Sequence, residues 1–134
     1  MGSQGYNNPT SHIIYGSGNA WVYPTRAYVE DALGAYCTAG SNYQYLGLKG
    51  FGFTIPATAS ITGIEVRVKC FKNGGTSTLN VVIKKADGTQ SGDRQITDTT
   101  EYVEYFLGGS SDLGGLNLTA ADVNNANFQV VISP

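Results

Sequence analysis

Residues 46–72 have the sequence LGLKGFGFTIPATASITGIEVRVKCFK, which holds the clearest structural pattern in the chain. In its second half, apolar residues at positions 64, 66, 68 and 70 alternate with charged residues at 65, 67 and 69. This period of two places an apolar row and a charged row on opposite faces of a β-strand. In its first half, Phe51, Phe53 and Ile55 share one face, and the glycines beside them indicate a bulge or a close approach of another backbone. We therefore predict two long strands, 41–55 and 60–72, at the centre of a β-sandwich. The first is expected either to run through or to break near Gly47.

Strand-like segments separated by turn residues recur along the rest of the chain. We expect a short strand at 12–15 and further strands at 78–86, 94–97, 101–107 and 127–133. The Asn-Gly-Gly sequence at 73–75 predicts a hairpin turn, since Asn and Gly accept a positive φ. Thr119 and Asp122 have the spacing of a capping box, which predicts a short connecting helix over 119–124. The predicted fold class is all-β, a jelly-roll-like β-sandwich with this one short helix.

The length of 134 residues fits one domain with a sizeable core. Residues 1–20, rich in Gly, Asn and Ser, predict an extended N-terminal arm, and residues 21–134 predict the sandwich domain. Such an arm becomes ordered on meeting a partner or stays frayed; both alternatives are open at this point.

Charge and hydropathy limit the classes of partner that the protein is expected to bind. The formal net charge is −2, which does not supply the cationic surface that nucleic acid binding requires, so no nucleic acid partner is expected. No apolar run approaches the ~18 residues of a membrane span, and the N-terminal sequence is unlike a secretory signal. Cys37 and Cys70 are expected to be free thiols; a disulfide between them would contribute about 3–4 kcal/mol in the chain-entropy model.

No pattern of catalytic or metal-ligating residues stands out. The chain has one histidine and two distant cysteines, which gives no zinc spacing, and it has no G-x-S-x-G elbow. The aspartates at 87, 93 and 98 lack the spacing of a calcium loop and are expected to form turns. We predict no catalytic residue, cofactor or metal, and hence no enzyme. A carboxylate pair of the kind that cleaves glycosides is set by the fold, so its spacing in the sequence does not test it.

Tyrosine and charge are distributed unevenly. Seven of the nine tyrosines precede residue 46, where they can supply interface area or simply fill strand faces. Residues 49–85 carry six basic residues and one acid, whereas residues 86–134 carry seven acids and one base. The basic and acidic residues can form complementary patches that join different subunits, or they can form ion pairs within one sheet of one molecule. From these features we select the following interaction candidates: Tyr6, His12, Tyr15, Trp21, Arg67, Lys69, Glu101 and Glu104.

The order of several motifs resembles a known family. These motifs are Trp21 with an acidic turn ten residues on, LKGFGFTIP at 48–56, ASITGIEVRV at 59–68 and LTAADVNNANFQVVI at 118–132. They resemble small jelly-roll domains of tailed-phage virion proteins and of related prophage and bacterial surface proteins. The chain departs from that pattern at Leu113, where a tryptophan is usual, and at Gln129, where a glycine is usual.

The resemblance implies a virion component without catalysis, with a capsid decoration protein as the leading expectation. Such proteins commonly form homo-trimers and contact the major capsid protein or other virion subunits, with weak contacts strengthened by multivalency. The expected location is the virion surface, after synthesis in the host cytoplasm. Three alternatives stay open: a glycan- or receptor-binding module of a tail fibre, with an exposed Tyr or Trp21 as a stacking platform; a subunit of an extracellular filament; and a glycosidase fragment.

Overall fold

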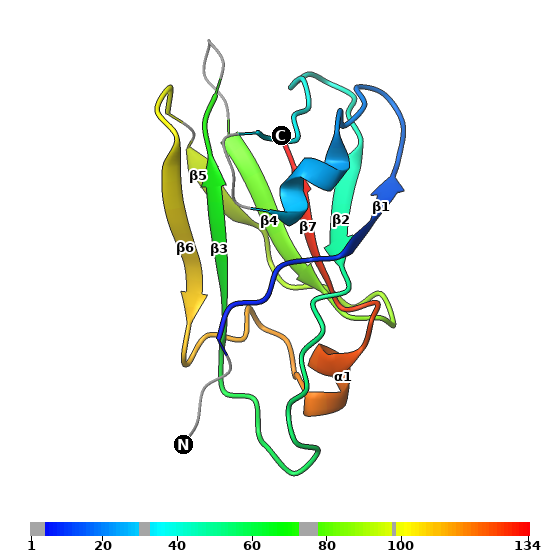
Figure 1. Ribbon diagram of the computed structural model, residues 1–134, viewed down its shortest axis with the longest axis vertical. Coiled ribbons are helices and arrows are strands. Elements are labelled where there is room, and N and C mark those ends of the chain that lie inside the picture. Colours follow the sequence, from blue (N-terminus) through cyan, green and yellow to red (C-terminus); the bar gives the residue numbers. More distant parts are fainter. Residues whose placement is uncertain (1–4, 30–32, 73–77, 98) are drawn as a thin grey trace.

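The computed structural model describes residues 5–29, 33–72, 78–97 and 99–134 and shows an all-β sandwich, as predicted. The larger sheet is antiparallel and has the order β1-β2-β7-β4-β5, formed by Ser11–Tyr15, Tyr45–Lys49, Gln129–Ser133, Thr78–Lys84 and Arg94–Thr97. The smaller sheet pairs β3 (Ile64–Cys70) with β6 (Val103–Gly109). A 3-10 helix, η1 (Pro24–Tyr28), and an α-helix, α1 (Ala120–Asn124), complete the described elements (Figure 1).

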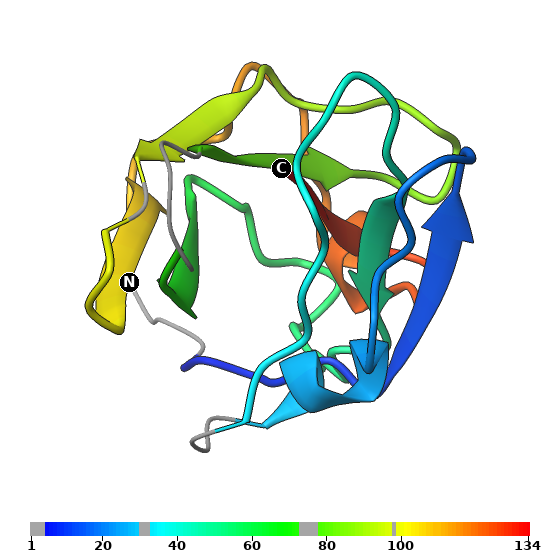
Figure 2. The same ribbon diagram turned by 90° about the horizontal axis from the view of Figure 1, so that it is seen from above.

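Three strand pairs are nested along the chain. β2 pairs with β7, β3 with β6 and β4 with β5, and each pair is antiparallel. The chain therefore follows one long hairpin that is wound so that its successive pairs form the two layers, which is the jelly-roll type of winding. Seen from above, the larger sheet curves round and β3 and β6 close the side opposite β7 (Figure 2).

The two strands predicted at 41–55 and 60–72 are shorter than expected and lie in different sheets. β2 ends at Lys49, and residues 50–63 form no regular strand. The reason is the backbone at Gly50 and Gly52, whose φ angles of 72° and 68° belong to the left-handed region and end the extended conformation. The side chains of Phe51, Phe53 and Ile55 nevertheless pack on the core, which explains their apolar pattern.

The hairpin predicted at 73–75 lies outside the described residues. Its flanking strands, β3 and β4, belong to different sheets, so the prediction that they pair across it is wrong. The strand predicted near 12–15 is confirmed as β1, which pairs with β2 at the edge of the larger sheet. Residues 11–15 of the expected arm are thus part of the sandwich.

The core lies between the two layers in two clusters. One contains Leu46, Leu48, Leu79, Val81, Ile96 and Ile132, and the other contains Ile83, Leu116, Leu118, Val123 and Phe128. Helix α1 supports the second cluster through Val123. Its capping box is confirmed: Thr119 accepts a hydrogen bond from the Asp122 N–H, and the Asp122 carboxylate accepts one from the Thr119 N–H. Cys37 and Cys70 are in the thiol form and share no disulfide, also as predicted.

Candidate interaction surfaces

Residues 6–10 lie against the chain's own domain. The Tyr6 hydroxyl donates a hydrogen bond to Glu65 on β3, and the Arg67 guanidinium lies 4.6 Å from the centre of the Tyr6 ring. Arg67 also pairs with Glu104 on β6, with 3.1 Å between Nε and Oε1. Three predicted interaction candidates, Tyr6, Arg67 and Glu104, therefore meet in one cluster within one molecule. We call these three residues with Glu65 the Tyr6 cluster.

The same segment then crosses to the larger sheet. The Asn7 amide donates to the carbonyl of Phe51 at 2.8 Å, and the Thr10 N–H donates to the carbonyl of Lys49 at 3.0 Å. Figures 1 and 2 show this segment running from β3 to β1. It ties the smaller sheet to the edge of the larger one.

Three of the described ion pairs join the basic and acidic parts of the chain within one molecule. Besides Arg67–Glu104, Lys85 pairs with Asp122 at 3.4 Å and with Asp87 at 4.0 Å. Of the two explanations for the uneven charge, pairing within the molecule accounts for these residues. Lys69 lies 5.3 Å from the ring centre of Tyr102, and Glu101 is exposed in the segment before β6.

His12 and Trp21 have partners inside the domain. His12 Nδ1 lies 2.6 Å from the hydroxyl of Tyr28 in η1, and burial raises the pKa of that hydroxyl. The Trp21 indole N–H donates to the carbonyl of Gln44 at 2.9 Å, and the ring packs against the first core cluster. Trp21 therefore fixes the segment before η1 to the sandwich, and its half-buried ring is not the exposed stacking platform that the glycan-binding alternative named as one possibility.

A surface that the sequence analysis missed combines exposed apolar residues from three segments. Tyr23 contacts Tyr36 edge-on, with ring centres 6.1 Å apart, and Phe71 lies 5.2 Å from Tyr102. Gly34 precedes Tyr36 by two residues and lies near the second pair, because a Cβ at this position would be 3.7 Å from the Tyr102 hydroxyl. We call Tyr23, Leu33, Tyr36, Phe71 and Tyr102 the aromatic end; their exposed fractions are 38–55 %. One signal was present in the sequence: Phe71 follows Cys70 directly and breaks the alternation of β3.

A second surface is a cleft on the outer face of the larger sheet. Its lining includes Tyr15, Tyr45, Asn80, Lys84, Asp93 and Ser133. Only Tyr15 was predicted, because the other residues come from separate strands and are brought together by register. The alternation of β4 did place Asn80 and Lys84 on the face opposite the core.

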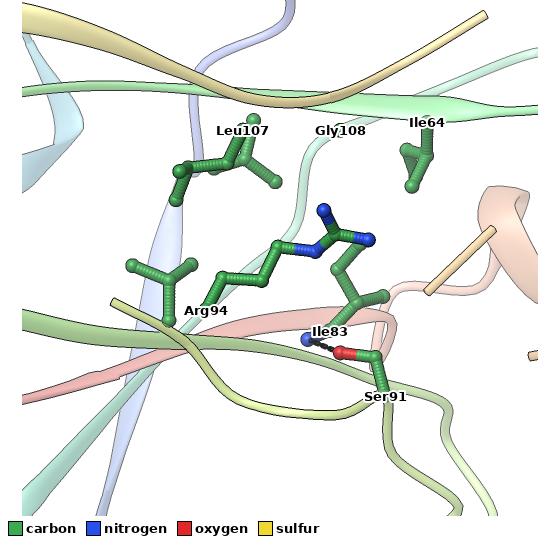
Figure 3. Close-up of a pocket in the computed structure, with 8 residues that line it drawn as sticks. Ile64, Ile83, Ser91, Arg94, Leu107 and Gly108 are labelled. Carbon is green, nitrogen blue, oxygen red and sulfur yellow. Dashed lines mark hydrogen bonds between the residues drawn. The ribbon is translucent and has the colours of Figure 1, made fainter. Parts of the chain in front are cut away.

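A gap between the sheets has a structural role. Figure 3 shows the Arg94 side chain extending between the layers toward Ile64 and Gly108, above Ile83. The gap has a volume of about 10 Å³, room for one water molecule at most. Arg94 donates to the Asp112 carboxylate at 2.5 Å, and this bond, followed by one from the Gly114 N–H, lowers the pKa of Asp112. The pair links β5 to the segment that follows β6.

Comparison with known protein families, characterised proteins and solved structures finds no match to this chain. Within the described ranges, no group of three or more His, Cys, Asp or Glu side chains is arranged to hold a metal ion. No helix in that part of the chain is long and apolar enough to cross a membrane.

Proposed function

We propose that this protein is a non-enzymatic structural component of a tailed-phage virion, a decoration protein that binds the capsid surface. The order of its sequence motifs and the nested strand pairs of its sandwich support this proposal. The observation that carries it is the aromatic end, a surface suited to a protein partner. The major capsid protein is the proposed partner, and a homo-trimer is the proposed oligomeric state.

The aromatic end has the composition of a protein–protein interface. Contiguous exposed apolar residues mark interaction sites, and Tyr, Phe and Arg are enriched in the centres of interfaces. Arg26 lies 3.9 Å from the centre of the Tyr23 ring and Lys69 lies near Tyr102, so cations flank the apolar centre. Tyr23 also has φ 53°, an uncommon backbone conformation for a residue other than glycine. Strained residues of this kind cluster at binding sites.

The test is co-sedimentation of the purified protein with tailed-phage particles that were purified from the bacterial host in which the protein is made. A double variant, Tyr36→Ser with Phe71→Ser, removes two exposed rings without touching the core. We expect the double variant to lose most of its binding to particles, because a few aromatic residues carry most of the energy of an interface. The matched control is Tyr45→Ser, which removes an exposed ring from the other surface and is expected to bind normally.

Three outcomes would contradict the proposal. Wild-type protein that stays in the supernatant with intact particles has no capsid partner. A double variant that sediments as well as wild type places the contact elsewhere. Protein that sediments without particles forms filaments of its own, which is the alternative function.

A further inference from the structure

The cleft on the outer face of the larger sheet has an apolar floor and a polar rim. Strand register sets this arrangement: Tyr15 is opposite Tyr45, Asn80 is opposite Ser133, and Val82 is opposite Val131. The two valines line the cleft, belong to neither core cluster and are 8 % and 5 % exposed.

Tyr15 is held flat across the sheet by its neighbours. Its hydroxyl donates to Gln129 Oε1 at 2.8 Å, which requires the ring to lie over Gly47 on the intervening strand. A Cβ at Gly47 would lie 3.0 Å from the Tyr15 ring and 2.5 Å from Gln129 Oε1. The Lys84 ammonium group lies 4.2 Å from the centre of the same ring. This side of the cleft is therefore positioned before any ligand binds.

The other side of the cleft offers an exposed ring and a carboxylate. Tyr45 is 44 % exposed, and its ring lies 5.6 Å from that of Tyr43. The pKa of the Tyr43 hydroxyl is raised, first by the neighbouring Tyr45 hydroxyl and also by the charge of Asp93. Asp93 lines the same cleft as Tyr45 and supplies a carboxylate to it.

The lining offers both hydrogen-bond donors and hydrogen-bond acceptors and has no net charge. Lys84 donates, Asp93 accepts, and the hydroxyl or amide groups of Asn80, Gln90 and Ser133 do both. Of the described residues that line the cleft, Lys84 is the one cation and Asp93 the one anion. A strongly charged ligand would meet a like charge on one side, so the lining favours an uncharged ligand rich in hydroxyl groups.

We propose that this cleft binds a neutral saccharide. A sugar ring has one apolar face, which can stack on the exposed Tyr45 ring, and hydroxyl groups at its edge, which both donate and accept hydrogen bonds. The cleft volume of about 280 Å³ lies at the small end of ligand sites, which fits one or two sugar rings. The cleft and the aromatic end share no residue, so this inference does not depend on the proposed capsid contact.

Nuclear magnetic resonance titration of the ¹⁵N-labelled full chain tests the proposal. The probes are glucose, galactose, mannose, N-acetylglucosamine, lactose and maltose, with 3′-sialyllactose as the charged counterpart. We expect at least one neutral probe to give saturable shifts at the backbone amides of Tyr45, Asn80 and Ser133, with a Kd of about 1 mM or below. The charged probe is expected to bind more weakly.

Two cleft variants and one control assign the binding site. Tyr45→Ala and Asp93→Asn are each expected to raise the Kd about tenfold or more, since they remove the stacking ring and the acceptor. Tyr36→Ala removes an exposed ring from the aromatic end and is expected to leave the Kd unchanged. Amide spectra of each variant show whether its fold is retained.

Any of three results would overturn the inference. These are no saturable shift with any neutral probe, shifts that map away from the cleft, and stronger binding of 3′-sialyllactose than of lactose. A Tyr45→Ala variant that keeps the wild-type spectrum and the wild-type Kd would overturn it as well. None of these results bears on co-sedimentation with particles.

Discussion

At the scale of single residues, Gly47 shows how one missing side chain shapes a surface. The ring of Tyr15 and the amide of Gln129 occupy the space where its Cβ would be, with Ile13 at 2.9 Å. We expect Gly47→Val to lower the free energy of unfolding by about 1–3 kcal/mol, the range for overpacking a filled site. Urea denaturation monitored by tyrosine and tryptophan fluorescence measures the change.

The matched control for this variant is Gly92→Val, at a position where a Cβ meets nothing within 4 Å. Its effect is expected to stay within about 0.5 kcal/mol, as for most surface changes. Equal unfolding midpoints for the two variants would show that the ring of Tyr15 does not lie where the structure has it.

Three aspartates give the fold a pH dependence. Backbone N–H groups lower the pKa of Asp87 and Asp122, and Arg94 lowers that of Asp112. A carboxyl whose pKa is lower in the folded state stabilises the fold above its unfolded pKa of about 3.9. That contribution is lost as the pH falls through the folded value. We therefore expect the melting temperature to fall steeply below pH of about 4.

The variant Asp112→Asn separates the Arg94 pair from the other two carboxyls. It removes the charge that pairs with Arg94, so its melting temperature at pH 7 is expected to be lower than that of wild type. Its loss of stability between neutral and acid pH is expected to be smaller. Melting curves that run parallel to wild type at all pH values would show that the pair contributes nothing to this dependence.

At the scale of elements, α1 depends on its N-terminal cap. The helix has only five residues, and such short helices are marginal without capping and packing. Thr119→Ala removes the oxygen that accepts the Asp122 N–H, and we expect a loss of about 1 kcal/mol in unfolding free energy. Thr119→Ser keeps that oxygen and is expected to restore most of it. Equal losses in the two variants would point to the lost methyl packing instead.

The elements also show where sequence patterns stop being informative. The alternation in β3 and the capping box at Thr119 are local, and both were predicted correctly. The strand at Tyr45–Lys49 was predicted to run on to residue 55, because the apolar pattern continues through Phe51, Phe53 and Ile55 although the extended backbone ends at Gly50. In place of a neighbouring strand, the Asn124 side chain bonds to both the N–H and the carbonyl of Ile55, a contact between positions 69 residues apart.

The candidate sites were harder to predict than the strands, because they too depend on contacts between segments that are distant in the sequence. Tyr15 and Asp93 line one cleft only because β1, β2, β7 and β4 are adjacent in the sheet. The pairing of β3 with β4 was inferred from a turn sequence, whereas the nested winding places β6 beside β3. No local pattern encodes these neighbours, since they are set by packing across the whole chain.

At the scale of the whole molecule, the nested pairing joins distant parts of the sequence. β2 and β7 are adjacent although more than half of the chain separates them. Loop closure of this length is costly before the contacts form, so we expect folding in milliseconds to seconds rather than microseconds. Stopped-flow refolding from urea measures the rate. A single phase complete within the dead time of about a millisecond would contradict the nested topology.

The N-terminal segment allows the limits of the folded unit to be tested by truncation. Removing residues 1–10 deletes the bonds of Tyr6, Asn7 and Thr10 to the domain but leaves β1 intact. These bonds are exposed or half-buried, so we expect a loss of about 1–3 kcal/mol in unfolding free energy and a protein that still folds.

Removing residues 1–15 also takes away β1 and Ile14, which packs on the first core cluster. It leaves the edge of β2 without its partner strand, and such an edge promotes aggregation. We therefore expect the longer truncation to be insoluble or to unfold at much lower urea concentration, as measured by urea denaturation and size-exclusion chromatography. If both truncations are equally stable and monodisperse, β1 is dispensable and the sandwich begins after residue 15.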